Sequence, residues 1–359
     1  MAPGFSTSPL AGEVARHGGI GTLPSATLYE LSQYTYLRKD ALEQAKKIQN
    51  PVPLEVKQEI FHQVNLECII QEVKNAKFLS QGNGLIFMNF LHALTGFKDQ
   101  VQAACKAGVD GVVSGAGIAW DLPAITKEYP DVALGIILSD PKGVKIVVEK
   151  RMKDYGRTPD FFVFEDPSVA AGHLGVKTLD KVYDSKYFLQ NSLPLVRQWL
   201  NDNHCEHIAL IGAGGIVDAR DVRQVIGYGA DGVQLGTRFL ASEESQAHDK
   251  FKQAVVDSTA DDIVTYMSSV GLPARALRQS PILTSMLGVI AEKKTCIYDC
   301  LRSCGWRDGN QSLAQMCIIK ELIKSTTSGN GEGLMFVGKS ASRIYDILSV
   351  EQIMKTLAA

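Results

Sequence analysis

Residues 208–216 read Ile-Ala-Leu-Ile-Gly-Ala-Gly-Gly-Ile, an apolar strand that runs into three glycines. Residues 231–239, Asp-Gly-Val-Gln-Leu-Gly-Thr-Arg-Phe, repeat this arrangement after a short helical segment. Each turn brings unhindered backbone N–H groups to the start of a helix, where a phosphate group binds. A single turn of this kind can serve only to make a tight bend. Two in succession match the phosphate site that the last two strands of a (β/α)8 barrel form, and they predict a phosphorylated cofactor.

The composition is that of a large globular domain. The chain has 359 residues, of which 45% are hydrophobic, enough for a barrel with an appendage. Its formal net charge of -2 provides no field that would attract nucleic acid or anionic lipid. No apolar run approaches the roughly 20 residues of a membrane span, and the N-terminal residues lack an export signal. We therefore expect a small-molecule ligand and exclude nucleic acid and membranes as partners.

Seven cysteines, an odd number, indicate free thiols in a reducing compartment, and the expected location is cytoplasmic. Cys296, Cys300 and Cys304 follow one another at intervals of four, with Cys317 further on. On a helix such thiols would share a face and could in principle bind zinc or an iron–sulfur cluster. Because metal ligands usually have tighter spacing and lie on turns, we expect no metal and packing of this segment onto the barrel.

Short β-branched runs alternate with amphipathic helices, a pattern typical of parallel strands joined by crossovers. Seven strands are predicted, at residues 19–23, 85–89, 111–114, 132–138, 160–164, 208–211 and 232–235. Helices are predicted at residues 8–16, 101–107, 144–153, 194–201 and 219–226, among others. The fold class is therefore α/β, a (β/α)8 TIM barrel that lacks one strand.

The missing strand is the first one. Ser8–Arg16 looks like the first barrel helix, with serine as N-cap and proline at the first helical position. A first strand should precede it, where only residues 1–4 stand, so we expect that strand to be truncated and the native start to lie upstream.

We expect residues 1–257 to form the barrel, with a helical insertion at residues 25–81 that breaks at Asn50–Pro53. Residues 258–359 are expected to form a helical extension that packs on the barrel, without clear strand pairs apart from the run at 333–337.

The loop after residues 160–164 brings a carboxylate and an imidazole to the catalytic end of the barrel. Glu165 follows the strand directly, and His173 lies among small residues that would let a flat ring approach. An isolated loop histidine usually just satisfies nearby carbonyl groups. Beside a double phosphate signal, His173 becomes a candidate catalytic base.

The run Glu165–Gly175 resembles the Glu-Gly-x-x-Ala-Gly-Gly-His-x-Gly signature of the nitronate monooxygenase (2-nitropropane dioxygenase-like) family of FMN-dependent barrels. Further blocks resemble this family in the same order along the chain, at residues 18–22, 114–117, 212–216, 232–239, 271–276 and 333–338. Asp166 and Ala171 stand where the family has glycine. A carboxylate at 166 would raise the pKa of His173 if the two groups are close, and the β-carbon of Ala171 would narrow the approach to the ring.

The resemblance implies FMN across the barrel mouth, with its phosphate on the glycine turns and its ring near His173. Glu165 would bind a ribityl hydroxyl or merely cap its loop, and residues 2–3 would be the remnant of a segment that supports the ring. The strand-end residues Asn89 and Ser114 would contact the ring or ribityl part, unless they only cap their strands. The implied cofactor-binding residues are Ala2, Pro3, Asn89, Ser114, Glu165, Gly172, Gly214, Gly215, Gln234, Gly236 and Thr237.

The implied activity is oxidation of an alkyl nitronate, such as propionate 3-nitronate, to a carbonyl compound and nitrite with O2. His173 would take the α-proton of a neutral nitroalkane or donate a hydrogen bond to an ionised nitronate. The barrel also resembles flavin-dependent enoyl-acyl carrier protein reductases and quinone reductases, so NAD(P)H is an alternative electron donor. A third alternative is a flavin-binding subunit without catalytic activity.

Overall fold

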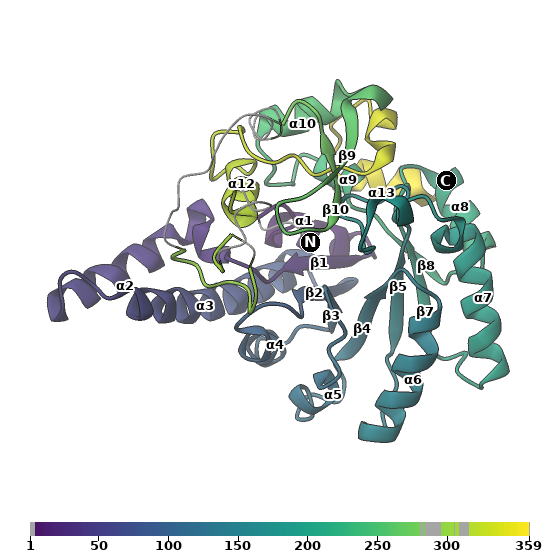
Figure 1. The fold of residues 1–359 in the computed structure, drawn as a ribbon, viewed down its shortest axis with the longest axis horizontal. Coiled ribbons are helices and arrows are strands. Elements are labelled where there is room, and N and C mark those ends of the chain that lie inside the picture. The colour runs from purple at the N-terminus through teal and green to yellow at the C-terminus, as the bar shows by residue number, and fades with distance from the viewer. Residues whose placement is uncertain (1–3, 281–282, 284–295, 305, 309–315, 359) are drawn as a thin grey trace.

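The computed structural model of the protein describes residues 4–280, 283, 296–304, 306–308 and 316–358. Its main sheet has seven parallel strands and curls into a barrel (Figure 1). In spatial order the strands are β1 (Ile20–Pro24), β2 (Leu85–Leu91), β3 (Gly111–Gly115), β4 (Ala133–Leu138), β5 (Phe161–Glu165), β7 (Ala209–Ala213) and β8 (Gly232–Gln234). All seven strands predicted from the sequence are present, and the predicted fold class is confirmed.

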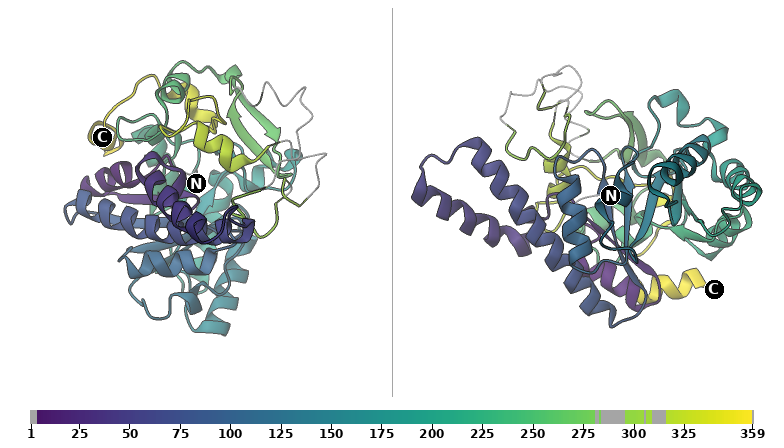
Figure 2. Two further views of the ribbon diagram at one scale, coloured as in Figure 1. Left: turned by 90° about the vertical axis from the view of Figure 1, so that its left-hand side faces the viewer. Right: turned by 90° about the horizontal axis from the view of Figure 1, so that it is seen from below.

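Helices cover the outer face of this sheet (Figures 1 and 2). They are α1 (Ser8–Arg16), α3 (Leu54–Ser80), α4 (Phe97–Lys106), α5 (Leu122–Ile125), α6 (Lys142–Tyr155), α7 (Leu189–Asp202) and α8 (Ala219–Gly227). Apolar side chains such as Ile136, Phe162 and Leu193 fill the layer between strands and helices.

Apolar side chains fill the inside of the barrel, most of them aliphatic. The rings of Phe87 and Phe161 stack there with centroids 5.3 Å apart. Glycine is required beside them, because a Cβ at Gly135 would lie 2.1 Å from the Phe161 ring. The inside of the barrel is therefore a packed core, and in barrels of this kind the ligand site lies at the carboxyl ends of the strands.

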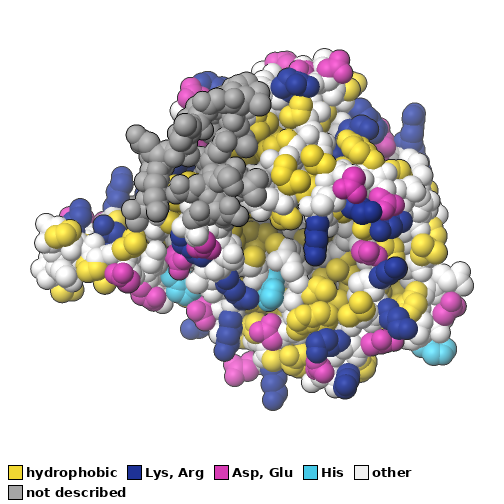
Figure 3. Space-filling view, viewed as in Figure 1, with side chains coloured by type: hydrophobic (Ala, Val, Ile, Leu, Met, Phe, Trp, Pro, Cys, Tyr) yellow, Lys and Arg dark blue, Asp and Glu magenta, His cyan; other side chains and the backbone are white. Residues whose placement is uncertain are grey.

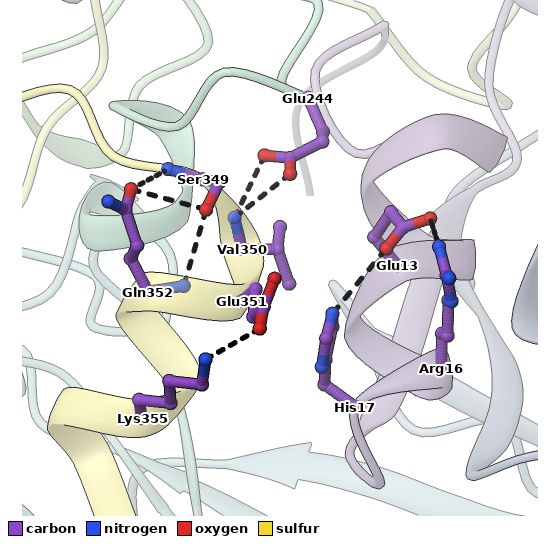
Figure 4. Close-up of polar contacts among 9 residues, drawn as sticks. All are labelled: Glu13, Arg16, His17, Glu244, Ser349, Val350, Glu351, Gln352 and Lys355. Carbon is purple, nitrogen blue, oxygen red and sulfur yellow. Dashed lines mark hydrogen bonds and ion pairs between the residues drawn. The ribbon is translucent and has the colours of Figure 1, made fainter.

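The sheet is open between β8 and β1, each of which has a single strand partner among the described residues. The gap lies where we expected the first strand. Helix α13 (Val350–Ala358) packs near it, against α1 and α8, and Figure 2 shows this C-terminal helix beside the N-terminal one. Both carboxylate oxygens of Glu244 accept from the N–H of Val350 at 3.0 Å, which caps α13 (Figure 4).

The segment at 25–81 is helical, as its sequence predicts. It contains η1 (Leu28–Glu30), η2 (Ser32–Tyr34), α2 (Thr35–Ile48) and α3, with the break at residues 49–53. Helix α2 has no buried residue and projects from the barrel beside the first half of α3 (Figure 1). Val73 and Ala76, in the second half of α3, are fully buried in the core that α1 shares.

The part of the chain after β8 combines helices with a second, antiparallel sheet. Its helices are α9 (Thr237–Leu240), α10 (Asp249–Val256), η5 (Ala260–Asp262), α12 (Ile318–Lys324), η6 (Lys339–Arg343) and α13. The second sheet has the order β6-β10-β9 and consists of β6 (Gly172–His173), β10 (Pro273–Leu277) and β9 (Ile263–Met267). The short helices η3 (Leu179–Lys181) and η4 (Ser185–Tyr187) follow β6.

The hairpin β9–β10 corrects our expectation that no clear strand pairs follow residue 257, apart from the run at 333–337. The sequence of β10 is Pro-Ala-Arg-Ala-Leu, which has low strand propensity by itself and becomes a strand by pairing on both sides. The run at 333–337 contributes only an isolated bridge between Phe336 and Ala276.

Two further observations bear on possible partners. None of the described helices is both long and apolar enough to cross a membrane. Lysine and arginine side chains are interspersed with aspartate and glutamate over the visible face, without a band of one sign (Figure 3).

Candidate active site at the barrel mouth

The second sheet holds His173 at the mouth of the barrel. His173 pairs with Ala274 of β10, and its Nε2 lies 3.1 Å from the hydroxyl of Ser268 in the β9–β10 turn. The edge of the imidazole meets the ring of Phe336, with centroids 5.6 Å apart. Burial lowers the pKa of His173 to about 4, because a charged imidazole loses its hydration there. The side chain is therefore neutral at physiological pH.

Asp166 does not act on His173 in the way we expected from the sequence. Its Oδ1 accepts hydrogen bonds from the N–H and hydroxyl of Ser168, and its Oδ2 accepts from the N–H of Leu189. The carboxylate thus shapes its own loop and joins it to α7. The pKa of His173 is lowered by burial rather than raised by this carboxylate.

Glu165 is the last residue of β5 and pairs in register with Ala213 of β7. It has the same inward orientation as Val163, which packs inside the barrel. Burial raises the pKa of Glu165 to about 7, against the opposing effect of the Arg275 charge. Its carboxyl group therefore changes ionisation near neutral pH. The side chain makes no hydrogen bond to a described residue.

The two glycine turns lie side by side, because β7 and β8 are neighbours in the sheet. The N–H groups of Gly214, Gly215 and Gly236 donate to no described residue. A Cβ built on Gly236 would meet nothing within 4 Å, so this side of the turn is open. Thr237 is held from the C-terminal extension, since its Oγ1 accepts from the N–H of Gly338 at 2.9 Å.

The N–H groups at the start of α8 are capped by side chains of the protein itself. From the sequence we had expected this helix end to bind the phosphate. The side chain of Asp218 accepts from the N–H of Asp221, and that of Asp221 accepts from the N–H of Val217. Arg343 pairs with both carboxylates. The groups left for an anion at this turn are therefore the loop N–H groups of Gly214 and Gly215.

Asn89 and Gln234 occupy inward positions at the ends of β2 and β8. Asn89 is 6% exposed, and its Oδ1 has no hydrogen-bond partner among the described residues. A buried polar atom without a partner is uncommon and points to a missing ligand or water. Ser114 is fully buried too. Because side chains alternate along a strand, its side chain points the same way as that of Val112, towards the helices. A contact from residue 114 to a ligand in the mouth would therefore use its backbone.

The structure thus brings Asn89, Glu165, Gly172, His173, Gln234 and both glycine turns to one end of the barrel. Ala2 and Pro3 lie outside the described residues. Three residues that we did not single out also belong to the site: Ser268, Arg275 and Phe336. The only sequence signal for them was their position in or next to the family-like blocks at 271–276 and 333–338.

The cysteine-rich segment packs against the loop that follows β2, where the N–H of Thr95 donates to the carbonyl of Cys300 at 3.1 Å. Cys296, Cys300, Cys304 and Cys317 are free thiols, and burial raises the pKa of Cys300 to about 12. Residues 296–304 form bends and a bridge to Leu94, so the helical spacing that we considered for the thiols is wrong. Tyr298 and Leu301 pack against the barrel core. Among the residues that the structure describes, no histidine, cysteine and carboxylate groups come together as a metal site.

A parallel barrel with a glycine cradle and a buried polar mouth is the architecture of a cofactor-dependent (β/α)8 enzyme. Comparison with known proteins identifies the family. A family model described as nitronate monooxygenase matches residues 1–359. A probable nitronate monooxygenase of Bacillus subtilis is 28% identical over 286 residues, which cover 77% of this chain and 74% of that protein. One of Staphylococcus saprophyticus is 28% identical over 181 residues, 50% of this chain and 47% of that protein.

Two solved structures share the fold. FabK from Thermotoga maritima has a TM-score of 0.65 at 20% identity and covers 99% of this chain and 88% of its own. Nitroalkane oxidase from Streptomyces ansochromogenes has a TM-score of 0.64 at 18% identity and covers 100% of this chain and 92% of its own. The chain belongs to the nitronate monooxygenase family and is a flavin-dependent oxidoreductase.

Proposed function

We propose that the protein binds FMN and oxidises alkyl nitronates to carbonyl compounds and nitrite, with O2 as the oxidant. The observation that carries the proposal is the neutral imidazole of His173, held by Ser268 and Phe336 at the mouth of a barrel of this family. Family membership supports the reaction class. Propionate 3-nitronate serves as the test substrate.

The residues at the mouth fit FMN. Its phosphate would be held by Thr237 and by the N–H groups of Gly214, Gly215 and Gly236, which donate to no described residue. The turn at Gly236 is open, whereas Val169 lies beside Gly214 and Gly215. Asn89 offers a buried Oδ1 that lacks a partner. Glu165 and Gln234 lie at the same level of the barrel, on either side of Ala213. A Cβ at Gly172 would lie 3.3 Å from the Phe336 ring, so glycine lets this ring pack closely beside His173. When bound, FMN would supply the redox chemistry.

A neutral His173 is better suited to an ionised nitronate than to a neutral nitroalkane. A general base works best when its pKa is near the working pH, and the pKa of about 4 makes His173 a weak base at pH 7. A neutral imidazole can still donate one N–H to the nitro oxygens of an anion. We therefore assign His173 the role of hydrogen-bond donor and catalytic residue.

The proposed partners are a small nitronate or nitroalkane and O2. NAD(P)H is the alternative electron donor. If it reduces the flavin in place of the nitronate, the protein is a reductase. All seven cysteines are free thiols, which supports a reducing compartment. We propose the cytoplasm on that ground.

Anaerobic mixing tests the function. Purified protein loaded with FMN is mixed with propionate 3-nitronate, NADH or NADPH, and the visible absorption of the flavin is followed. Bleaching by the nitronate supports the proposal, whereas bleaching by a nicotinamide alone supports a reductase and overturns it. No bleaching by any of them supports a non-catalytic flavin-binding subunit. His173→Gln should slow nitronate bleaching, while the control His207→Gln, at an exposed position, should not.

A further inference from the structure

Arg275 is a buried cation placed directly behind the loop that carries Glu165 and His173. Its side chain is 1% exposed, and its backbone pairs with Gly172 across the β6–β10 ladder. It lies in neither the glycine cradle nor the inward positions of the barrel. A buried guanidinium is costly unless each of its N–H groups finds a partner, so its contacts indicate what it does.

Two of the three hydrogen bonds of the Arg275 guanidinium go to carbonyl oxygens of the site loop. Its Nη2 donates to the carbonyl of Pro167 at 3.1 Å, and its Nη1 donates to the carbonyl of Ala170. Its Nε donates to Thr265 Oγ1 at 3.2 Å, which ties the side chain to β9. The fork of Arg275 therefore joins the site loop to the second sheet.

At its two ends, the loop between Asp166 and His173 is held by the bond from Leu189 to Asp166 and by the pairing of His173 with Ala274. Between these ends it has few contacts besides those of Arg275. The carbonyl of Val169 accepts from the N–H of Lys339 at 2.9 Å, and the N–H of Leu174 donates to the carbonyl of Pro273 at 3.0 Å. Without Arg275, the carbonyls of Pro167 and Ala170 would be buried and unpaired, which drives local rearrangement. That rearrangement would reach His173 three residues later.

We propose that Arg275 is a positioning residue, whose guanidinium holds Pro167 and Ala170 and thereby fixes where His173 stands in the mouth. The proposal rests on the proposed function in so far as His173 is the group that meets the substrate. Lysine cannot replace arginine here, because one ammonium cannot reproduce a planar fork with three acceptors and is readily deprotonated when buried.

The test compares Arg275→Lys and Arg275→Met with the control Arg278→Lys. Arg278 is exposed, and among the described residues its guanidinium donates only to the carbonyl of Asp261. In full-length protein saturated with FMN, diethyl pyrocarbonate modifies neutral histidines, and mass spectrometry measures the rate at His173 relative to exposed His204. Both Arg275 variants should raise this ratio about tenfold, the factor expected for loss of a charge-assisted hydrogen bond. The Arg278 variant should leave the ratio unchanged.

Steady-state kinetics supply the second readout. Misplacement of His173 should lower kcat about 10- to 100-fold with little change in KM. An unchanged His173 to His204 ratio in both Arg275 variants would overturn the proposal. So would an increase shared equally by both histidines, which indicates general loosening. If the wild-type protein does not oxidise nitronates, the proposed function fails, whereas the modification ratio still decides the role of Arg275.

Discussion

The hydroxyl of Ser268 lies 3.1 Å from Nε2 of His173, although 95 positions separate the two residues in the chain. Ser268 is held in turn by the β9–β10 hairpin, where its N–H donates to the carbonyl of Leu272 at 2.9 Å. A segment that follows the last barrel strand thus places the partner of the proposed catalytic imidazole.

Replacing Ser268 by alanine removes this partner and should lower kcat for nitronate oxidation about three- to tenfold, the value of one neutral hydrogen bond. Flavin binding should be unchanged, because Ser268 does not belong to the glycine cradle. Ser269→Ala is the matched control, since the Ser269 hydroxyl faces the carbonyl of Met316 instead. Equal kcat values in the two variants would contradict the prediction.

The stability of the protein should depend on pH through two groups, His173 and Glu165, whose effects largely cancel. The pKa of His173 falls from 6.5 to about 4 in the folded state, so folding loses stability as the pH drops from 6.5 to 4. The pKa of Glu165 rises from 4.5 to about 7, so folding loses stability as the pH rises from 4.5 to 7. The two effects have opposite signs over most of the same range, and each is worth at most about 3 kcal/mol.

Single variants should reveal the two contributions. In His173→Gln the free energy of unfolding should decline from pH 4.5 to 7, because Glu165 remains. In Glu165→Gln it should increase from pH 4 to 6.5, because His173 remains. Urea unfolding at a series of pH values, with FMN removed, measures both slopes. Parallel curves for wild type and both variants would show that neither group has the stated pKa.

Gly236→Ala should weaken FMN binding about tenfold or more, since a loss of about 1.4 kcal/mol has this effect. The residue has a φ of -116° and an added Cβ meets no protein atom within 4 Å, so alanine fits the folded protein. Only a ligand on the cradle would collide with the new methyl group. Gly227→Ala, equally open but within α8, is the control.

Titration calorimetry measures the affinity of the Gly236→Ala variant for FMN, and thermal unfolding of the flavin-free protein measures its stability. Wild-type affinity would contradict the placement of the phosphate on this turn. A lowered melting temperature without FMN would point to a structural role of the glycine.

Glu244→Ala should destabilise the protein by about 1 kcal/mol, because it removes the carboxylate that caps α13. The loss should be local to α13 and its contact with α1, where hydrogen exchange should increase (Figure 4). The neighbouring variant Glu243→Ala should have no such effect, since Glu243 contributes only its backbone to Leu348 and Lys252. Unchanged exchange in α13 would show that the cap is dispensable.

Much of the mouth could be predicted from local sequence. The strands at residues 85–89, 160–164 and 232–235 were predicted, and parallel pairing alone brings their carboxyl ends together, with Asn89, Glu165 and Gln234. Alternation along β3 could also have shown that the side chain of Ser114 faces the helices. Local sequence could not show how Asp166 is used, because one of its carboxylate oxygens binds the N–H of Leu189, 23 positions away in the chain.

The barrel can be predicted from local sequence, because strand periodicity and glycine-rich turns are properties of a few consecutive residues. The surroundings of His173 depend on long-range packing. Its neighbours Ser268, Arg275 and Phe336 are brought near by chain packing across about a hundred residues or more, and no local pattern records such contacts. The charge state of the imidazole follows from that packing, since burial sets its pKa.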